Sequence, residues 1–121
     1  MKRCSCFKEI HDRRGHGVGD EALTTLARML EGCLRPYDRG ARWGGDEFLV
    51  LLSPCDGATL EAIAQRVRAD IERGSAASGE TFTVTVGACL AEPGETPGTV
   101  LQRADEALYR AKQAGRNRVV I

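Results

Sequence analysis

The sequence predicts an α/β domain of the α+β type, in which a central, mostly antiparallel sheet is flanked by helices. Three observations support this prediction. Apolar residues recur every three or four positions in three separate stretches, which is typical of amphipathic helices. Short apolar runs lie between these stretches, and a Gly-Gly pair separates two strand-like segments, as in a tight hairpin. With 121 residues, the chain is expected to form one domain, 1–121, around a hydrophobic core.

The first helix is expected over Asp20–Leu34, where leucines recur at helical spacing and Asp20 stands at the N-cap position. A hairpin follows, with the Gly44-Gly45 pair as its turn, because glycine adopts positive φ without steric cost. Phe48–Leu52 then forms the second strand of this hairpin. Its unbroken apolar run is typical of a strand covered on both faces.

The second half of the sequence repeats this alternation. A second helix is expected to follow Asp56 and to end near Gly74, since apolar residues again recur at helical spacing. Thr81–Val86 alternates as a strand does, and a third helix begins near Thr99 and ends at Gly115. The expected closing strand is Arg118–Ile121.

Composition narrows the class of protein. Lysine plus arginine equals aspartate plus glutamate, at 17 each, so no overall positive field indicates binding to DNA or RNA. The sequence has no bilayer-length apolar span and no secretory signal at its start, so we expect a cytoplasmic domain, alone or within a larger sensor protein, without direct membrane contact. The five cysteines are odd in number and scattered, which favours reduced thiols over a disulfide framework.

The stretch ARWGGDEFLVLL, residues 41–52, places two acids directly after the glycine pair. A glycine turn lets a phosphate chain approach the backbone, and Asp46 and Glu47 could hold a divalent cation that neutralises phosphate charge. A solvated acidic hairpin is the other interpretation, and composition alone favours it.

Three motifs in order resemble the GGDEF domains of bacterial diguanylate cyclases: FKEIHDRRGHGVGD at 7–20, RWGGDEF at 42–48 and ADEALYRAKQAGRNRV at 104–119. The resemblance implies a fold like the polymerase palm and nucleotidyl cyclase core. It also implies a reaction that joins two GTP molecules into cyclic di-GMP and releases pyrophosphate. The implied cofactor is Mg²⁺ or Mn²⁺, and the implied assembly is a homodimer, because two domains that each hold one GTP must face each other.

The resemblance also assigns the catalytic residues. Gly44 and Gly45 would let the phosphates come close. Asp46 would be a metal ligand, and Glu47 would assist the metal or deprotonate the attacking 3′-hydroxyl. In this chemistry, catalysis is mostly alignment and neutralisation of charge.

Substrate contacts follow from the same resemblance. Asp20 would accept hydrogen bonds from guanine, and His11 stands where the family has a guanine-reading Asn. Lys8, from the loop between strand and helix, would contact the β- and γ-phosphates together with Lys112 and Arg116. The residues by themselves allow a plainer account, in which Asp20 only caps a helix and Lys112 and Arg116 only complement a helix dipole.

The segment Arg35-Pro36-Tyr37-Asp38 matches the RxxD inhibitory site of the family, and residues 39–43 separate it from Gly44 with the family spacing. Arg66 aligns with an additional arginine of that site, so cyclic di-GMP is the implied ligand. Arginine suits this role because its planar fork can pair with a guanine edge or a phosphate. A lone RxxD is otherwise a salt bridge in a surface turn.

The sequence departs from the family at its beginning. Arg3 and Ser5 occupy the positions of an Asp-x-Asp pair whose first member binds metal, and a guanidinium cannot ligate Mg²⁺. By the same resemblance, we expect the family's N-terminal helix to be absent and only Met1–Cys6 to remain of the first strand. These departures keep two alternatives open: an impaired domain that binds cyclic di-GMP or GTP as a regulatory module, and a structural remnant that serves dimerisation.

A zinc site is a rival interpretation of the same region. Cys4, Cys6, His11 and His16 form a C-x-C…H…H set of possible ligands, although their spacing is not that of a familiar zinc finger. Two small thiols on a strand and two solvated histidines are the alternative.

Overall fold

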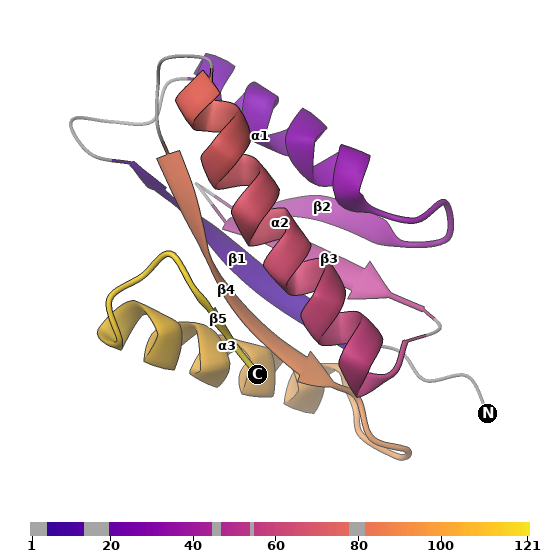
Figure 1. The fold of residues 1–121 in the computed structure, drawn as a ribbon. Helices are drawn as coiled ribbons and strands as arrows, with labels where there is room; N and C mark the ends of the chain where they lie inside the picture. The colour runs from indigo at the N-terminus through magenta and orange to yellow at the C-terminus, as the bar shows by residue number, and fades with distance from the viewer. Residues whose placement is uncertain (1–4, 14–19, 45–46, 54, 78–81) are drawn as a thin grey trace.

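The computed structural model describes residues 5–13, 20–44, 47–53, 55–77 and 82–121, which form an alternating series of strands and helices (Figure 1). In chain order, the elements are β1 Ser5–Arg13, α1 Asp20–Cys33, β2 Arg39–Gly44, β3 Glu47–Leu52, α2 Gly57–Ala77, β4 Phe82–Leu90, α3 Pro97–Gln113 and β5 Val119–Val120.

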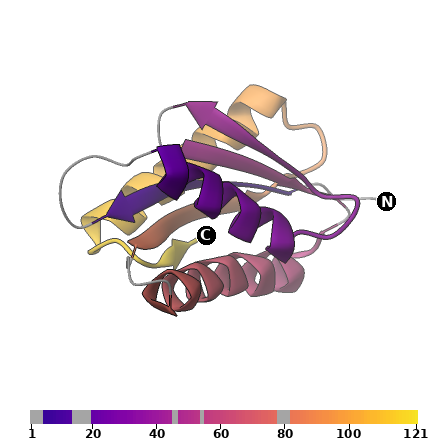
Figure 2. The same ribbon diagram turned by 90° about the horizontal axis from the view of Figure 1, so that it is seen from above.

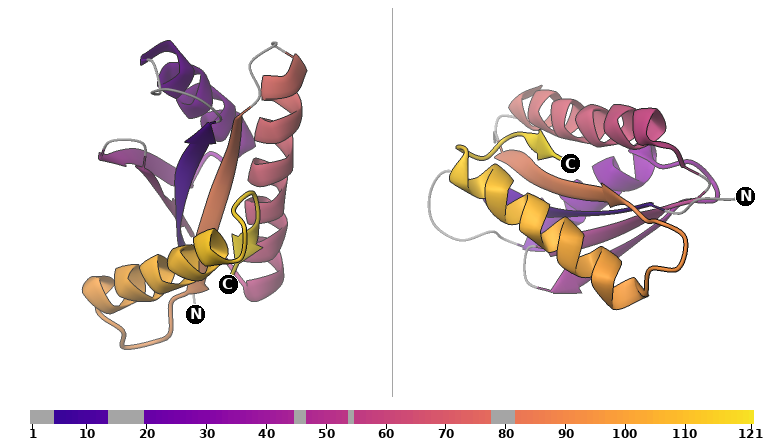
Figure 3. Two further views of the ribbon diagram at one scale, coloured as in Figure 1. Left: turned by 90° about the vertical axis from the view of Figure 1, so that its left-hand side faces the viewer. Right: turned by 90° about the horizontal axis from the view of Figure 1, so that it is seen from below.

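Within these residues, five strands form one sheet in the order β2-β3-β1-β4-β5. Neighbouring strands are antiparallel except β4 and β5, which run parallel. α1 and α2 lie on one face of the sheet, and α3 packs on the other (Figure 2, Figure 3). The predicted α+β arrangement with a mostly antiparallel central sheet is therefore confirmed.

The main core lies between the sheet and the α1–α2 layer. Leu26 of α1, Leu60 and Ile71 of α2 and Val50 of β3 are all fully buried there. A smaller cluster lies under α3. Gly87 of β4 permits this contact, because a Cβ at that position would stand 2.6 Å from the carbonyl oxygen of Ala104. β4 is therefore packed closely on both of its faces.

The central strand β1 is longer than expected. The resemblance predicts a short strand that ends at Cys6, whereas β1 continues to Arg13. It pairs with β4 along its whole length, from Ser5 opposite Leu90 to Arg13 opposite Phe82. Because an extended segment gains backbone hydrogen bonds with each added pair, the long β4 draws these residues into the sheet. The expectation of a short central strand is wrong.

Other boundaries shift for local reasons. β4 extends to Leu90 because Gly87, which interrupts the apolar alternation, is the point of contact with α3. α2 runs past Gly74 to Ala77, since Gly74 packs against Met29 of α1 and does not end the helix. In the hairpin, Gly44 pairs with Glu47, so the two-residue connection is 45–46 and not Gly44-Gly45.

α3 begins at Pro97, slightly earlier than predicted. Thr96 is its N-cap, and the Thr96 hydroxyl accepts a hydrogen bond of 3.3 Å from the backbone N–H of Thr99. Cys33, Cys55 and Cys89 are buried, and none of these three is in a disulfide. Among the helices that the structure describes, none combines the length and apolar content needed to cross a membrane.

Candidate active site

The β2–β3 hairpin positions Glu47 at the start of β3, which lies between β2 and β1. Gly44 of β2 pairs with Glu47, next to a register shift in β2, and Glu47 stands opposite Ile10 of β1. The Glu47 side chain is half-buried. Gly45 and Asp46 lie outside the described residues. Of the predicted catalytic set, the structure therefore places Gly44 and Glu47, and it places them side by side.

The same row of residues leads across the sheet toward α3. Ile10 stands opposite Thr85 of β4, so Glu47, Ile10 and Thr85 lie next to one another on three adjacent strands. Thr85 is fully buried, and its Oγ1 accepts a hydrogen bond of 3.0 Å from the backbone N–H of Asn117. Two strand spacings separate Glu47 from Thr85, or about 10 Å. The turn after α3 thus lies at the end of the sheet that carries Glu47.

This turn, which contains Lys112 and Arg116, has a defined backbone. The N–H of Arg116 donates to the carbonyl oxygen of Ala111 at 3.0 Å, and that of Gly115 donates to Lys112 at 3.2 Å. The pair of bonds is a Schellman motif, which commonly ends helices. Lys112 is half-buried in the last turn of α3, and Arg116 is exposed beyond the helix end. The helix-dipole account therefore suits Lys112 better than Arg116.

Lys8 and His11 lie within β1, so the prediction that Lys8 lies in a loop before the first helix is wrong. The reason is the continuous pairing of β1 with β4, which places Lys8 opposite Gly87. His11 directly follows Ile10, the β1 residue that stands opposite Glu47. Asp20 begins α1, as the sequence predicts.

The N-terminal end of β1 lies far from the hairpin. Ser5 pairs with Leu52, at the opposite end of β3 from Glu47. Ile10 follows Ser5 by five positions, which corresponds to about 17 Å along a strand. Position 5 of β1 and Glu47 therefore lie at opposite ends of β3. Arg3 lies outside the described residues.

Glu47 supplies the kind of ligand that Mg²⁺ prefers. Magnesium in nucleotide sites binds through one or two carboxylates together with phosphates of the substrate. In the part of the chain that the structure describes, no group of three or more His, Cys, Asp or Glu side chains could hold a metal ion. Glu47 thus fits a metal ion shared with a triphosphate, with Asp46 as the second predicted ligand.

The alternative zinc site is incompatible with β1. Cys6 and His11 are five residues apart on one extended strand, about 17 Å, whereas zinc binds its ligand atoms at about 2.0–2.3 Å. Two positions this far apart on one strand are too distant to share a zinc ion. Cys4 and His16 lie outside the described residues.

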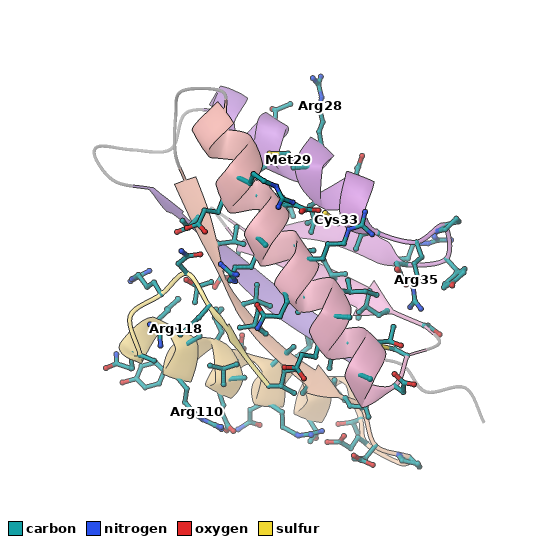
Figure 4. All side chains as sticks on the ribbon, in the orientation of Figure 1. Arg28, Met29, Cys33, Arg35, Arg110 and Arg118 are labelled. Atoms are coloured by element: carbon teal, nitrogen blue, oxygen red, sulfur yellow. The ribbon has the colours of Figure 1, made fainter. Side chains whose placement is uncertain are left out.

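Arg35 and Asp38 close the turn between α1 and β2. The Nε and Nη2 atoms of Arg35 donate to the two carboxylate oxygens of Asp38, both at 2.9 Å, and the Arg35 backbone N–H donates to Oδ2 at 2.8 Å. The Arg35 guanidinium also lies 4.7 Å from the ring centre of Tyr37. The Asp38 side chain is fully buried, while that of Arg35 is 25% exposed. These contacts hold the guanidinium in one orientation at the surface (Figure 4).

The charge state of this pair is stable at neutral pH. Burial by itself raises the pKa of Asp38, but the hydrogen bonds from the Arg35 side chain and backbone outweigh it and hold that pKa below its usual range. The same side-chain hydrogen bond raises the pKa of Arg35. The turn salt bridge that the residues alone allow is therefore present.

Arg66 lies on α2, beside the part of that helix that contacts the end of α1. Its Nε atom donates to Oδ2 of Asp70 at 3.4 Å, and the Sγ of Cys33 at the end of α1 lies 3.8 Å from the same oxygen. Arg35 follows Cys33 by two residues. The structure thus brings the part of α2 that carries Arg66 beside the end of α1, whereas Arg118 and the turn after α3 lie on the other side of the molecule (Figure 4).

A group of polar residues beside the turn after α3 was not predicted from the sequence. Nη1 of Arg68 donates to Oδ1 of Asn117 at 3.2 Å, and Nδ2 of Asn117 donates to Oε2 of Glu72 at 2.5 Å. The one available signal was an asparagine just past a helix-ending Gly-Arg, where the left-handed conformation favours Asn. Its partners on α2 could not be found from spacing, because they lie 45 and 49 residues away.

Comparison with known proteins identifies the family. The model of the family described as "Diguanylate cyclase, GGDEF domain" matches residues 1–118. The chain is 43% identical over 114 residues to diguanylate cyclase DgcM of Escherichia coli K12, an alignment that covers 94% of this chain and 28% of that protein. It is 37% identical over 119 residues to diguanylate cyclase A of Treponema denticola, which covers 95% of this chain and 32% of that protein. The chain therefore spans less than a third of these relatives.

Solved structures show the same fold. The active GGEEF domain of a diguanylate cyclase from Vibrio cholerae superposes with a TM-score of 0.88 at 27% identity, covering 99% of this chain and 83% of that chain. The diguanylate cyclase SiaD of Pseudomonas aeruginosa, solved with its activator SiaC, gives a TM-score of 0.87 at 32% identity and covers 98% of this chain and 50% of that chain. The extent of the family match and the identity to its members together show that this chain belongs to the GGDEF domain family of diguanylate cyclases.

Proposed function

We propose that this chain is a cyclase domain that binds one GTP and, facing a second copy of itself, condenses two GTP molecules into cyclic di-GMP with release of pyrophosphate. The proposal rests on one observation. The row of residues that runs across β3, β1 and β4 places Glu47 of the hairpin and the turn that contains Arg116 at one end of the sheet. In this arrangement, the acid and the basic turn are placed to contact the two ends of a bound triphosphate. Membership of the family supports the reaction class.

The proposed reaction is an attack of the 3′-hydroxyl of one nucleotide on the α-phosphorus of the other. Catalysis then consists mainly of alignment and of neutralising the phosphate charge. Glu47 orients or accepts the hydroxyl proton, and Gly44 with Gly45 admits the phosphates to the backbone. Bound Mg²⁺ or Mn²⁺ would neutralise phosphate charge, and Asp46 and Glu47 are the residues that would hold it.

The remaining contacts bind the substrate. Lys112 and Arg116 pair with the β- and γ-phosphates, where Arg116 has the bidentate geometry that phosphate favours. Lys8 is the third proposed phosphate contact. Asp20, at the start of α1, and His11 of β1 are the proposed contacts to guanine.

The turn of Arg35 and Asp38, together with Arg66, is the proposed inhibitory site for cyclic di-GMP. The support is its preorganisation, since the buried Asp38 carboxylate fixes the plane of a guanidinium that stays partly exposed. A relative, the GGDEF domain of DgcB from Caulobacter crescentus, has been solved in complex with c-di-GMP. Product bound at this turn would limit turnover.

A second candidate function is a regulatory module that binds GTP or cyclic di-GMP without turnover. The pairing of Ser5 with Leu52 favours it, because this register places the start of β1 at the opposite end of β3 from Glu47. Arg3 and His11, at family positions for metal and guanine, point the same way.

Incubation of the chain with GTP and Mg²⁺, followed by chromatography for cyclic di-GMP, tests the first function. We expect product from the native chain and about a hundredfold less from Glu47→Gln, because a positioned general base contributes at least that factor. Calorimetry with cyclic di-GMP runs alongside, on the native chain and on Arg35→Ala. Loss of a charged hydrogen bond should weaken binding by about 1.5 kcal/mol, or roughly tenfold.

Arg28→Ala is the matched control for the calorimetry, because Arg28 is an exposed arginine of α1 that points away from the Arg35 turn (Figure 4). Binding of cyclic di-GMP without any product would favour the regulatory module. A chain that neither forms product nor binds GTP or cyclic di-GMP would contradict both functions. Equal affinity in native chain and Arg35→Ala would remove the inhibitory-site assignment.

A further inference from the structure

We infer that Asn117 is a positioning residue for Arg116, and that Arg68 and Glu72 of α2 hold Asn117 in place. The inference rests on the proposed function, since it concerns how the basic turn is presented to the phosphates of GTP. Neither α2 residue belongs to any of the motifs that mark the site in the sequence. Their contribution arises because α2 passes beside the turn that follows α3.

The side-chain amide of Asn117 is a bridge with a defined orientation. Its oxygen accepts from Nη1 of Arg68 at 3.2 Å, while its nitrogen donates to Oε2 of Glu72 at 2.5 Å. Arg68 and Glu72 also pair with each other, with Nη1 3.7 Å from Oε1. An amide is suited to this place because it presents one acceptor to the cation and one donor to the anion. An aspartate at this position would place a second negative charge opposite that of Glu72.

The backbone around Asn117 is held at several points. Its N–H donates to Oγ1 of the buried Thr85, and the next carbonyl, that of Arg118, accepts from the N–H of Val86 at 2.9 Å. On the other side, the N–H of Arg116 is tied to Ala111. Arg116 therefore lies between one backbone hydrogen bond to α3 and two hydrogen bonds to β4.

The backbone conformation of this turn is one that surrounding contacts must stabilise. Arg116 has a φ of 64° and Asn117 a φ of 45°, which is the left-handed region that residues with side chains seldom occupy. Two such residues in succession persist only where surrounding contacts determine them. The bridge from Asn117 to α2 supplies side-chain contacts of that kind. Because Arg68 and Glu72 carry opposite charges, the bridge adds no net charge near the phosphates, and its effect is one of position.

The effect of the bridge on the position of Arg116 is measured as the preference for a triphosphate. This preference is the ratio of the affinity for a triphosphate to the affinity for a monophosphate. The ligands are a GTP analogue that lacks the 3′-hydroxyl, which cannot react, and the corresponding GMP analogue, both measured by calorimetry with Mg²⁺. In Arg68→Ala, the preference for triphosphate should fall about fivefold, the factor that a lost hydrogen bond produces. Arg73→Ala is the matched control, because Arg73 lies on the same helix, is 76% exposed and pairs with Asp70.

A second pair of variants separates the bridge from simple repulsion. Asn117→Asp should also lower the preference for triphosphate, because the new carboxylate faces Glu72. Adding Glu72→Gln restores a donor opposite that carboxylate and restores the native net charge, so the preference should recover. Because the double variant restores the net charge together with the bridge, Arg68→Ala combined with Glu72→Ala is measured beside it. This pair breaks the bridge at constant net charge, and the preference should fall. Thermal unfolding of each variant verifies that the domain is folded under the conditions of binding.

The outcomes distinguish this inference from the proposed function. A native chain that does not prefer the triphosphate, or whose preference survives Arg116→Ala, overturns the phosphate site and the inference with it. A preference that depends on Arg116 but is unchanged in Arg68→Ala and Asn117→Asp overturns the inference alone. Loss in both variants, with recovery when Glu72→Gln is added to Asn117→Asp and no change in Arg73→Ala, supports it.

Discussion

At the scale of single residues, the buried carboxylate of Asp38 decides the geometry of the turn between α1 and β2. Its two oxygens accept three hydrogen bonds from Arg35, one from the backbone and two from the guanidinium. A carboxylate with this many donors is stabilised in its ionised form. The turn should therefore depend on pH in a defined direction.

The pKa of Asp38 is lower in the folded chain than in the unfolded one, where it is about 3.9. Its contribution to stability is complete above the unfolded value and is lost as the pH falls through the folded value. In Asp38→Asn, we expect the free energy of unfolding at pH 7 to drop by about 2 kcal/mol, the scale of charged hydrogen bonds. Urea unfolding at pH 7 and at pH 3 measures this loss.

The difference between native chain and Asp38→Asn should shrink at pH 3, because the Asp38 carboxyl of the unfolded chain is mostly protonated there and must give up that proton when the chain folds. Glu61→Gln, which removes an exposed acid of α2, is the control and should leave the stability at pH 7 nearly unchanged. A difference between native chain and Asp38→Asn that stays constant from pH 7 to pH 3 would contradict the assignment.

At the scale of elements, the placement of α3 depends on its contact with β4. Gly87 is buried, and a Cβ there would stand 2.5 Å from the Cα of Leu108 and 2.6 Å from the carbonyl oxygen of Ala104. Backbone atoms cannot move aside as a flexible side chain can. α3 also carries Lys112 and leads into Arg116, so the distance between α3 and the sheet sets where these cations lie.

Gly87→Ala should therefore destabilise the domain by about 3 kcal/mol, at the upper end of the cost of overpacking a core. Gly98→Ala is the control, because no atom lies within 4 Å of the added methyl group and alanine is the better helix former. Thermal unfolding of the two variants compares them directly. Equal melting temperatures would show that the approach of α3 to β4 does not require glycine.

At the scale of the whole molecule, the proposed reaction needs two copies of the domain. Each copy holds one GTP, so the productive assembly forms only when two chains meet. The specific rate of cyclic di-GMP formation should then rise with protein concentration and level off once the dimer is saturated. The affinity for the unreactive GTP analogue should not change over the same range. A specific rate that is constant on dilution would contradict the need for a dimer.

Much of the fold could be predicted from the sequence because its signals are local. Helical spacing of leucines located α1, and the apolar run after the glycine pair located β3. The start of α1 at Asp20 was also found, since a helix start depends on neighbouring residues. The hairpin that carries Glu47 also followed from glycine and strand patterns, although its connection lies one residue later than the glycine pair predicts.

The sequence by itself therefore determined the family, the succession of elements and most candidate site residues, which are contiguous motifs. Only the tertiary structure decided how far β1 extends, because strand length depends on pairing with β3 and β4. It alone placed Glu47 and the turn of Arg116 at one end of the sheet, and it alone joined Asn117 to α2. These features rest on contacts between residues dozens of positions apart, and such contacts leave no periodic or compositional trace along the chain.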